Sequence, residues 1–348
     1  MAQSTMRAIK ITAPGKAEVQ TVALPSSRDT YIRVRTHSVA LNPTDWKHID
    51  RMYTVGCTVG CDFSGTVESV GSAVTKHFKP GDKVAGFLHG SNSLEPEDGS
   101  FGEYLVAKGD IAIALPENLS FEEGATLGVG VTTVGQGLYQ KLALPLPGKG
   151  NTDGDYLLVY GGSTATGSLA IQYARLSGSR VISINSPHND EFVKSLGAEK
   201  SFDYHDPECG AKIRAYTKDS LQKAFDTISE ADSPRICGEA LSSKGGGQIS
   251  YLLRGTDAGR TDIKSSYTLA YTATGEDVVM GKQKMPANPE DREFGRTFWE
   301  LTRGLLSEGK LKVHPPEIRQ GGLDKVLEGL DDLRKGRVSG KKLVYNIQ

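Results

Sequence analysis

The 348-residue sequence lacks the features of a membrane or secreted protein. No stretch approaches the ~18 consecutive apolar residues that a membrane-spanning helix needs. The N-terminal segment contains no apolar core like that of a signal peptide, and Arg7 comes early. Lysine and arginine (41) nearly balance aspartate and glutamate (42), so no basic excess favours nucleic acid as a ligand. These absences predict a soluble, cytoplasmic protein without a membrane or nucleic-acid partner.

Cysteine is also scarce, and its spacing argues against a structural metal site. The four cysteines include one close pair, Cys57 and Cys61, while Cys209 and Cys237 stand alone. A structural zinc site usually takes four ligands arranged as two close pairs. We therefore expect no metal. We interpret Cys57 and Cys61 as small apolar side chains on a strand and on the approach to it.

The chain is long enough for about two domains, and its first part is predicted to be rich in β-strands. Residues 31–35 alternate between the two faces of a strand. Residues 62–71 form a second predicted strand that ends at a glycine turn, and the turn at 79–82 leads into a third. Short strands separated by glycine and proline predict a barrel-like β domain up to about residue 130.

The pattern changes near residue 130, where predicted strands begin to alternate with helices. The helices expected in this part are 131–142, 168–176 and 190–196, and the strands are 155–160, 180–185, 224–228 and 247–251. This alternation predicts a parallel, doubly wound sheet, and so an α/β fold.

The last part of the chain is expected to return to the β-rich domain. It contains predicted helices at 296–308 and 323–335, followed by a final strand at 342–346. The expected organisation is therefore a first domain in two pieces around a sheet domain, with limits at 1–130, 131–280 and 281–348.

The segment after strand 155–160 has the features of a nucleotide-binding loop. Glycines bound the loop at Gly161 and Gly167, and a helix follows. Small residues at this place let backbone N–H groups and the helix N-terminus face a pyrophosphate. The residues that we expect to bind it are Ser163, Thr164, Ala165 and Thr166. Because Thr164 and Ala165 occupy positions where glycine is often found, a simple turn remains the alternative.

The next predicted strand ends without an acidic residue. Units that bind NAD usually carry Asp or Glu there, which accepts hydrogen bonds from the ribose 2′-OH. The sequence instead has Ser186, Pro187, His188 and Asn189. Their side chains suit a 2′-phosphate, which an acid would repel, so NADPH is the expected cofactor. The same residues also suit the start of a helix, and the two interpretations are compatible.

These motifs, in their order and spacing, resemble the medium-chain dehydrogenase/reductase superfamily in its zinc-free, quinone-oxidoreductase-like branch. The resemblance extends over almost the whole chain and implies a split GroES-like catalytic domain around a Rossmann domain. The segments that carry it are 38–45, 60–65, 70–71, 80–84, 99–104, 161–167, 196–198 and 202–204.

Within that branch the sequence most resembles the fungal trans-acting enoyl reductases, the lovastatin-type partners of iterative polyketide synthases. The segments that suggest this are 160–166, 186–189, 202–204 and 336–344. The resemblance implies NADPH-dependent reduction of an α,β-unsaturated thioester on the acyl carrier protein of the synthase. It also implies a monomer. The edge at which other relatives pair, expected near Ser265 to Met280, is polar and irregular here.

The sequence departs from the zinc-binding members of the superfamily. Where those members carry a cysteine, it has Asn42 to Asp45, and no four-cysteine lobe lies between residues 85 and 115. We therefore interpret His89 as an ordinary loop histidine. Hydrogen bonds, and not a Lewis acid, are expected to polarise the substrate carbonyl.

The resemblance also implies positions for the cofactor. It puts a first group, residues 44–47, beside the nicotinamide, and it puts Tyr204 near the adenine and 2′-phosphate. It also puts Leu252 and Leu253 along the nicotinamide edge, and residues 338 and 339 of the tail against the cofactor. Lys47 of the first group is also implied to be catalytic, because a cation there favours an enolate. These residues are Thr44, Asp45, Trp46, Lys47, Leu252, Leu253, Val338 and Ser339.

Two segments are implied to line the substrate channel. Thr133 is the second candidate catalytic residue, as a hydrogen-bond donor to the acyl or pantetheine group. The implied lining is Val131, Thr132, Thr133, Val134, Gly135, Gln136, Gly137, Leu138, Tyr271, Thr272, Ala273, Thr274 and Gly275. No residue pair identifies the proton donor. His37 and His48 are candidates without support, and water is the alternative.

Three functions remain open from the sequence. The first is the partner-dependent enoyl reductase. The second is a free-standing quinone or enone reductase, which would share every cofactor residue. The third is a protein that binds the cofactor without catalysis, which the two replaced glycines of the loop allow.

Overall fold

The computed structural model describes residues 4–150 and 154–347. Its contacts divide the chain into two compact units. Unit 1 contains the residues up to Thr132 together with those from Tyr271 onward, and unit 2 runs from Thr133 to Ala270. The boundary between unit 2 and the returning part of unit 1 was expected at residue 281 but lies after Ala270. The reason is that Tyr271 contacts Thr44 and His89 of unit 1.

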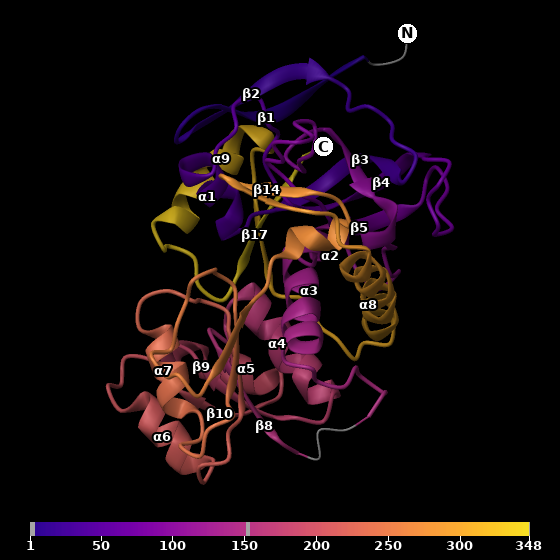
Figure 1. Ribbon diagram of the computed structural model, residues 1–348. Helices are drawn as coiled ribbons and strands as arrows, with labels where there is room; N and C mark the ends of the chain where they lie inside the picture. The colour runs from indigo at the N-terminus through magenta and orange to yellow at the C-terminus, as the bar shows by residue number, and fades with distance from the viewer. Residues whose placement is uncertain (1–3, 151–153, 348) are drawn as a thin grey trace. The chain divides into compact units, whose positions relative to one another are not determined.

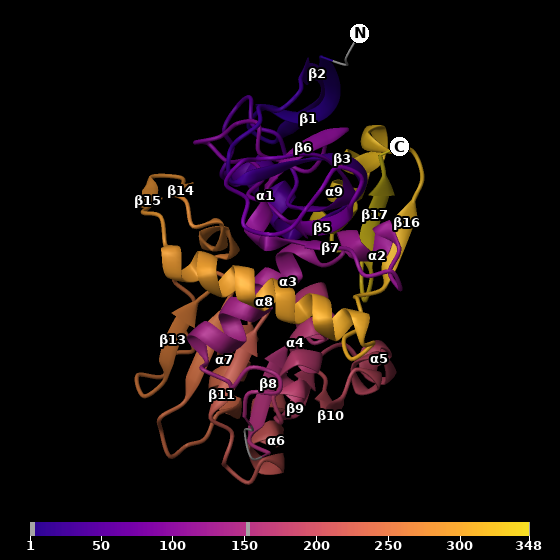
Figure 2. The ribbon, with the colours of Figure 1, turned by 90° about the vertical axis from the view of Figure 1, so that its right-hand side faces the viewer.

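Unit 1 is built on a seven-stranded sheet formed from both ends of the chain. Strands β16 (Pro316–Arg319) and β17 (Lys342–Asn346) pair in parallel, and the other neighbouring strands of this sheet pair antiparallel. Strand β6 (Tyr104–Lys108) pairs with β3 outside the main strand order. Figure 2 shows β16 and β17 side by side at the C-terminal end of the chain. The order is β16 (Pro316–Arg319), β17 (Lys342–Asn346), β3 (Tyr31–Ala40), β4 (Asp62–Val70), β5 (Lys83–Phe87) and β7 (Ala112–Ala114).

Helices and hairpins complete unit 1 (Figure 1). The antiparallel hairpin of β1 and β2 joins α1 and α9 around one apolar core, which contains Ile9, Ile49, Val326 and Leu343. A second hairpin, β14 with β15, follows the short helix η4. The elements are β1 (Thr5–Ala13), β2 (Lys16–Ala23), α1 (Pro43–Arg51), η1 (Gly109–Ile111), α2 (Phe121–Ala125), η4 (Ala270–Thr274), β14 (Val278–Met280), β15 (Gln283–Met285), α8 (Pro289–Ser307) and α9 (Leu323–Arg334).

Helix α8 is longer than the sequence pattern predicted, since it begins at Pro289 and not at 296. The side chain of Asn288 accepts hydrogen bonds from the backbone N–H groups of Glu290 (3.0 Å) and Asp291 (3.2 Å). An asparagine cap followed by proline is a strong helix start. The early start therefore follows from a capping signal that the apolar periodicity alone did not reveal.

Unit 2 is the expected doubly wound parallel sheet. Its six strands are all parallel, and β8 lies between β9 and β11, so the order reverses at this point. The strands are β10 (Ala198–Phe202), β9 (Arg180–Ile184), β8 (Tyr156–Tyr160), β11 (Lys223–Asp226), β12 (Gln248–Tyr251) and β13 (Lys264–Tyr267). Helices α4 (Ala165–Leu176), α5 (Asp190–Ser195), α6 (Cys209–Tyr216) and α7 (Ser233–Ala240) connect them.

The edge of this sheet is shorter than expected. The edge strand is β13, which ends at Tyr267, whereas the residues around Met280 pair with β15 in the separate hairpin of unit 1. Because the segment is polar, its sequence did not indicate that the residues around Met280 pair with a different strand. Within the described residues, no helix combines the length and the apolar character required to cross a bilayer.

Candidate active site

The glycine loop of unit 2 follows β8 and is tightly enclosed. Gly161 has a φ of +77°, which favours glycine. A Cβ on Gly162 would lie 2.0 Å from the Ser183 hydroxyl, and one on Gly167 would lie 2.1 Å from the Gly161 carbonyl oxygen. These two positions therefore have room for a hydrogen only, and the loop lies close against both β9 and the start of α4.

The loop presents the N-terminus of α4. Thr164 is the N-cap, and its hydroxyl accepts a hydrogen bond from the Gly167 N–H at 2.9 Å. The first N–H groups of a helix have no acceptor within the helix, and together with the helix dipole they favour an anion. Beside them, the Asn189 amide donates to the Ser163 hydroxyl at 3.1 Å. Two of the predicted cofactor residues are thus brought together.

The loop lies at the point where the strand order reverses. The Thr227 hydroxyl, which follows β11, donates to the Tyr160 carbonyl at 2.7 Å and lies 3.1 Å from the Thr164 hydroxyl. In doubly wound sheets, ligands bind outside the carboxyl ends of the strands at this reversal. The enclosed loop and the helix N-terminus fit the pyrophosphate of a dinucleotide.

The chain after β9 presents hydroxyl groups. The Ser186 hydroxyl donates to that of Tyr204 at 3.3 Å, and Tyr204 is 39% exposed. The nearest acid in sequence, Asp190, accepts a hydrogen bond from the Asn185 amide at 2.9 Å. This donor set suits a phosphate on the ribose. Pro187 and His188 are exposed beside it.

The chain after β12 is held by hydrogen bonds that involve Ser229 and Thr256. The Leu252 N–H donates to the Ser229 hydroxyl at 2.8 Å, and Ser229 itself has a φ of +60°. Leu252 and Leu253 are both half-buried. The sequence predicted a cofactor role for the leucines but none for Ser229, since a left-handed serine has no sequence signature of its own.

In unit 1, the start of α1 holds four of the predicted residues. Asp45 closes a capping box, because one of its carboxyl oxygens accepts the Asn42 N–H at 2.7 Å. Burial raises the pKa of Asp45 to about 8. Trp46 and Lys47 are half-buried, and the Lys47 Nζ lies 5.7 Å from the centre of the Trp46 ring. The carboxyl group of Asp45 therefore caps the helix start, while Lys47 lies over an aromatic face.

A buried ion pair links four elements of unit 1. The Lys342 ammonium lies 2.8 Å from the Asp62 carboxylate and donates to the Asn42 amide oxygen at 2.5 Å. The other oxygen of Asp62 accepts the Val129 N–H at 2.6 Å, at the start of α3 (Gly128–Val134). A Cβ on Gly128 would lie 2.3 Å from that oxygen. The pair thus holds the starts of α1 and α3 against β4 and β17, a role that sequence reasoning missed.

A neutral hydrogen-bonded cluster surrounds Tyr271. Its hydroxyl lies 2.8 Å from the Thr44 hydroxyl and 3.8 Å from the Cys61 sulfur. The His48 Nδ1–H donates to the Thr44 carbonyl at 2.8 Å, and His89 stacks on the Tyr271 ring at 4.0 Å. Burial raises the pKa values of Tyr271 and Cys61, lowers that of His48, and lowers that of His89 to about 3. His89 is therefore a buried member of this cluster, not the ordinary loop residue that was expected.

Most of the predicted channel segment at 131–138 faces inward. It is split between α3 and η2 (Gly135–Lys141), and Val131, Val134 and Leu138 are fully buried. The Thr132 hydroxyl donates to the Gly128 carbonyl at 3.0 Å and accepts the Trp299 N–H at 3.2 Å. Thr133 is buried as well, and so are Gly135, Gln136 and Gly137.

The second predicted channel segment and the tail residues lie in unit 1. The Thr272 hydroxyl donates to Asp291, and the Thr274 hydroxyl donates to the Tyr271 carbonyl at 2.9 Å. Ala273 is buried, and Gly275 has a φ of +71°. Val338 packs against the core of α1 and α9, whereas Ser339 is exposed. Tyr271 is thus the member of this set that is joined to a predicted cofactor residue, Thr44.

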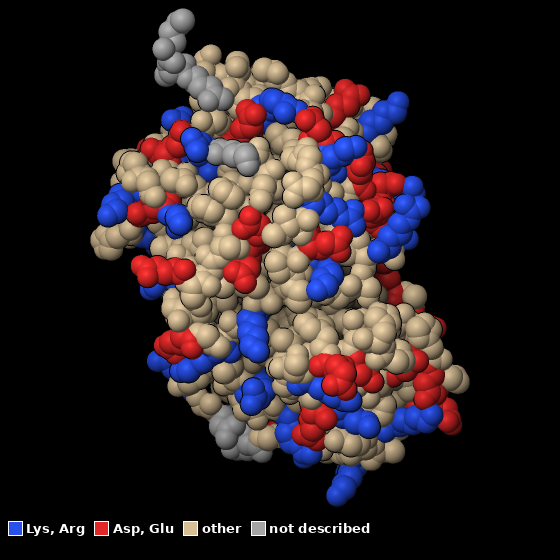
Figure 3. Space-filling model, turned by 180° about the vertical axis from the view of Figure 1, so that it is seen from behind, with Lys and Arg blue, Asp and Glu red and all other residues tan. Residues whose placement is uncertain are grey.

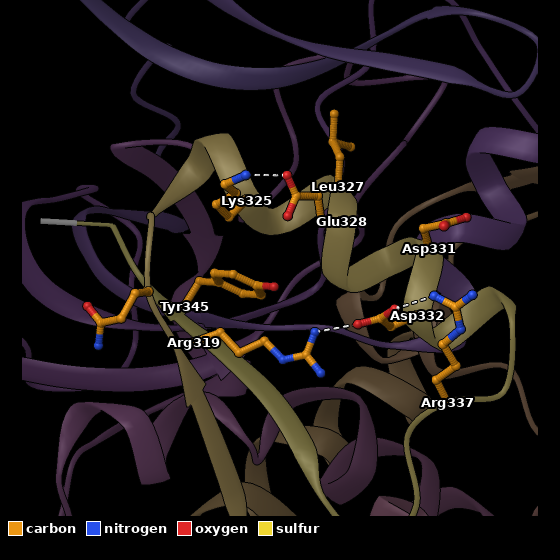
Figure 4. Close-up of a pocket in the computed structure, with 9 residues that line it drawn as sticks. Arg319, Lys325, Leu327, Glu328, Asp331, Asp332, Arg337 and Tyr345 are labelled. Atoms are coloured by element: carbon orange, nitrogen blue, oxygen red, sulfur yellow. Dashed lines mark hydrogen bonds and ion pairs between the residues drawn. The ribbon is translucent and has the colours of Figure 1, made fainter.

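A groove of about 740 Å³ runs along α9, but its charges are satisfied within it (Figure 4). Arg319 and Arg337 both pair with Asp332, and Lys325 pairs with Glu328. The groove thus balances its own cations with its own acids. In the part of the chain that the structure describes, no cluster of three or more His, Cys, Asp or Glu side chains forms a metal site.

Comparison with known proteins extends these observations to the whole chain. The alcohol dehydrogenase GroES-like domain matches residues 28–117. The trans-enoyl reductase ACTTS2 of Alternaria alternata is 49% identical, with 99% of each chain covered. The trans-enoyl reductase resD of Aspergillus sclerotiorum is 48% identical over 98% of this chain and 100% of its own.

A solved structure agrees with the fold and the class of enzyme. The quinone oxidoreductase of Coxiella burnetii superposes with a TM-score of 0.74 at 25% identity, with 99% of this chain and 100% of that chain covered. The similarity to the trans-enoyl reductases is closer and covers nearly the full length. This oxidoreductase chain therefore belongs to the trans-enoyl reductase family of the medium-chain dehydrogenase/reductase superfamily.

Proposed function

We propose that the protein uses NADPH to reduce the α,β-double bond of a polyketide thioester on the acyl carrier protein of an iterative synthase. The observation that carries the proposal is the hydroxyl pair of Ser186 and Tyr204 at the end of β9, where residues 185–189 contain no acid. A carboxylate there would repel a 2′-phosphate, whereas two hydroxyls can donate to it. The reaction itself is proposed from the similarity to relatives that are named trans-enoyl reductases.

The proposed roles divide the work between side chains and cofactor. Bound NADPH supplies the hydride that reaches the β-carbon. Lys47 stabilises the negative charge that develops on the thioester oxygen, because a nearby cation favours an enolate. Thr133 donates a hydrogen bond to the acyl or pantetheine group. Ser163, Thr164 and the first turn of α4 hold the pyrophosphate, and the proton for the α-carbon comes from water.

Two further properties belong to the proposal. We propose a monomer, because the edge strand β13 is short and presents Lys264, Ser265 and Ser266, which suit solvent better than a second sheet. We also propose that the protein acts in the cytoplasm. All four cysteines are free and buried, which fits a reducing compartment.

The free-standing quinone or enone reductase is the second candidate, and the 25% identity to a quinone oxidoreductase favours it. The two candidate functions are distinguished by measuring NADPH oxidation with crotonyl and longer 2-methyl-enoyl thioesters and, in parallel, with a simple quinone. Turnover of thioesters that is lost in Lys47→Ala and Thr133→Ala supports the enoyl reductase. Lys47→Arg and Thr133→Ser are the matched variants, which should keep part of the activity, and Lys16→Ala on β2 is an exposed control.

The opposite results are equally informative. Turnover of the quinone but of no thioester would support the free-standing quinone or enone reductase instead. Binding of NADPH without turnover of any acceptor would indicate a protein that binds the cofactor without catalysis.

A further inference from the structure

A small cavity of unit 1 lies at the end of α1. It has a volume of about 160 Å³ and is formed by the last turn of α1, the loop around Ser91 and the turn of the β14–β15 hairpin. His48 is part of its wall, and Arg51, Tyr53 and Met280 also line it. All of these residues belong to the same unit.

His48 gives the cavity an unsatisfied hydrogen-bond acceptor. The side chain is only 3% exposed. Its Nδ1–H donates to the Thr44 carbonyl at 2.8 Å, so the lone pair resides on Nε2. Burial lowers the pKa of His48, and the ring is therefore neutral. Nε2 is buried without a partner among the described residues. A buried acceptor of this kind calls for an N–H or O–H donor from a bound molecule.

The rim of the cavity carries an uncompensated cation. Arg51 is exposed, its guanidinium lies 5.7 Å from the centre of the Trp46 ring, and it forms no ion pair in the described parts of the chain. The neighbouring acid, Asp50, is already bound by Arg334 at 2.8 and 3.0 Å. By contrast, acidic and basic side chains lie close to one another over the face of the protein that Figure 3 shows.

Two exposed apolar side chains follow Arg51 closely in sequence, and the first of them, Tyr53, also lines the cavity. Tyr53 is 44% exposed and Val55 is 59% exposed. The site thus combines a cation at the mouth, apolar surface beside it, and a hydrogen-bond acceptor in the wall. An elongated ligand with a phosphate at one end and an amide N–H further along satisfies all three.

We propose that this cavity and its rim bind the phosphopantetheine arm that carries the thioester, with Arg51 on the phosphate and His48 Nε2 accepting an amide N–H. The inference rests on the proposed function, since a thioester on an acyl carrier protein is attached through this arm. It adds two residues, Arg51 and His48, that the sequence did not assign to binding, and it gives the carrier a physical point of recognition.

The test compares one enoyl group on three carriers. N-acetylcysteamine and pantetheine lack the phosphate, and phosphopantetheine has it. In Arg51→Gln we expect the KM of the phosphopantetheine thioester to rise about tenfold, because a charge-assisted hydrogen bond to phosphate is lost. The KM values of the other two thioesters and all kcat values should stay unchanged. Arg51→Lys should restore most of the loss, and Arg35→Gln, an exposed arginine on β3, is the matched control.

His48 is tested by His48→Phe, which keeps an aromatic ring but removes the acceptor. We expect the KM of the pantetheine thioester to rise several-fold, by a larger factor than kcat falls, because the ring also contacts Thr44. A thermal unfolding temperature close to that of the wild type shows that the variant is folded. If His48→Phe fails to fold, the Arg51 comparison decides alone.

Two results would overturn the inference. One is an equal rise of KM for all three carriers in Arg51→Gln, and the other is no rise for any of them. Failure of the proposed function is distinguished by the wild type, which would then reduce no enoyl thioester. In that case equilibrium binding of free phosphopantetheine to wild type and Arg51→Gln still tests the site, and equal affinities would refute it.

Discussion

The hydroxyl of Tyr271 lies 2.8 Å from the hydroxyl of Thr44 and so joins η4 to the first turn of α1. His48 also contacts Thr44, with its Nδ1 at 3.2 Å from the same hydroxyl. Thr44 is half-buried, whereas Tyr271 and His48 are buried. Two buried side chains therefore fix the rotamer of a hydroxyl that remains partly accessible.

Replacing Thr44 tests what this fixed hydroxyl does. Thr44→Val should lower kcat for enoyl thioester reduction about tenfold, because it removes the hydroxyl and leaves the Tyr271 hydroxyl without that partner. Thr44→Ser retains the oxygen and should keep most of the activity. The measurement is NADPH oxidation at saturating substrate. Equal activities of the valine and serine variants would show that the hydroxyl has no part in the reaction.

The ion pair of Lys342 and Asp62 should dominate the stability of unit 1. Lys342→Met leaves a buried carboxylate uncompensated, which costs about 3–5 kcal/mol in the free energy of unfolding. Lys341→Met, at the exposed neighbouring position, should change it by less than about 0.5 kcal/mol. Urea unfolding measures both variants. A similar small effect in the two would show that Asp62 is satisfied without the lysine.

The raised pKa of Asp45 predicts a pH dependence. The folded protein keeps a proton on Asp45 up to about pH 8, while the unfolded chain releases it near pH 4. The wild type should therefore lose stability relative to Asp45→Asn as the pH rises from about 4 to 8, by about 1.4 kcal/mol per pH unit. Unfolding curves of both proteins across this range test it. A difference that does not change with pH would mean that Asp45 is ionised in the folded protein.

Gly167 should be essential for cofactor binding. Gly167→Ala would bring a methyl group to 2.1 Å from the Gly161 carbonyl oxygen, so the loop must shift. We expect the Kd for NADPH, measured by fluorescence titration, to rise at least tenfold. Gly304→Ala is the matched control, because this position of α8 has open space around it. The control should leave binding unchanged and stabilise the helix by up to about 1 kcal/mol.

Ser186→Asp should reverse the choice of cofactor. The carboxylate would repel a 2′-phosphate and accept hydrogen bonds from a ribose 2′-OH. We expect kcat/KM for NADPH to fall about a hundredfold while that for NADH rises. Ser186→Ala is the control, since it removes the hydroxyl that meets Tyr204 without adding charge. Unchanged preference in the aspartate variant would place the 2′-phosphate elsewhere.

The sequence predicted β8, β9, β11 and β12 of the parallel sheet, because alternating apolar strands and helices leave a periodic signal, but it did not predict β10. Strand 155–160 and the glycine loop after it were located within a residue or two. The capped start of α8 and the separate β14–β15 hairpin were not, since caps and partner changes in polar segments leave little periodicity.

The candidate site was harder to predict for a different reason. Lys342 and Asp62, or His89 and Tyr271, are far apart in sequence, and each alone has an ordinary local context. Only the folded sheet of unit 1 makes a buried lysine the partner of a buried aspartate. The resemblance to a family predicted site roles for Thr44 and Tyr271, but it did not predict the hydrogen bond between them.

The position of Lys342 near the end of the chain also has a consequence for the order of folding during synthesis. Unit 2 is a continuous segment and has all its strands once Tyr267 has left the ribosome. Unit 1 must wait for β17, the last strand, which brings the cation that neutralises Asp62 on β4. Until then the N-terminal strands hold a carboxylate that burial would penalise. A chain cut before β17 should thus release a folded unit 2 attached to an incomplete unit 1.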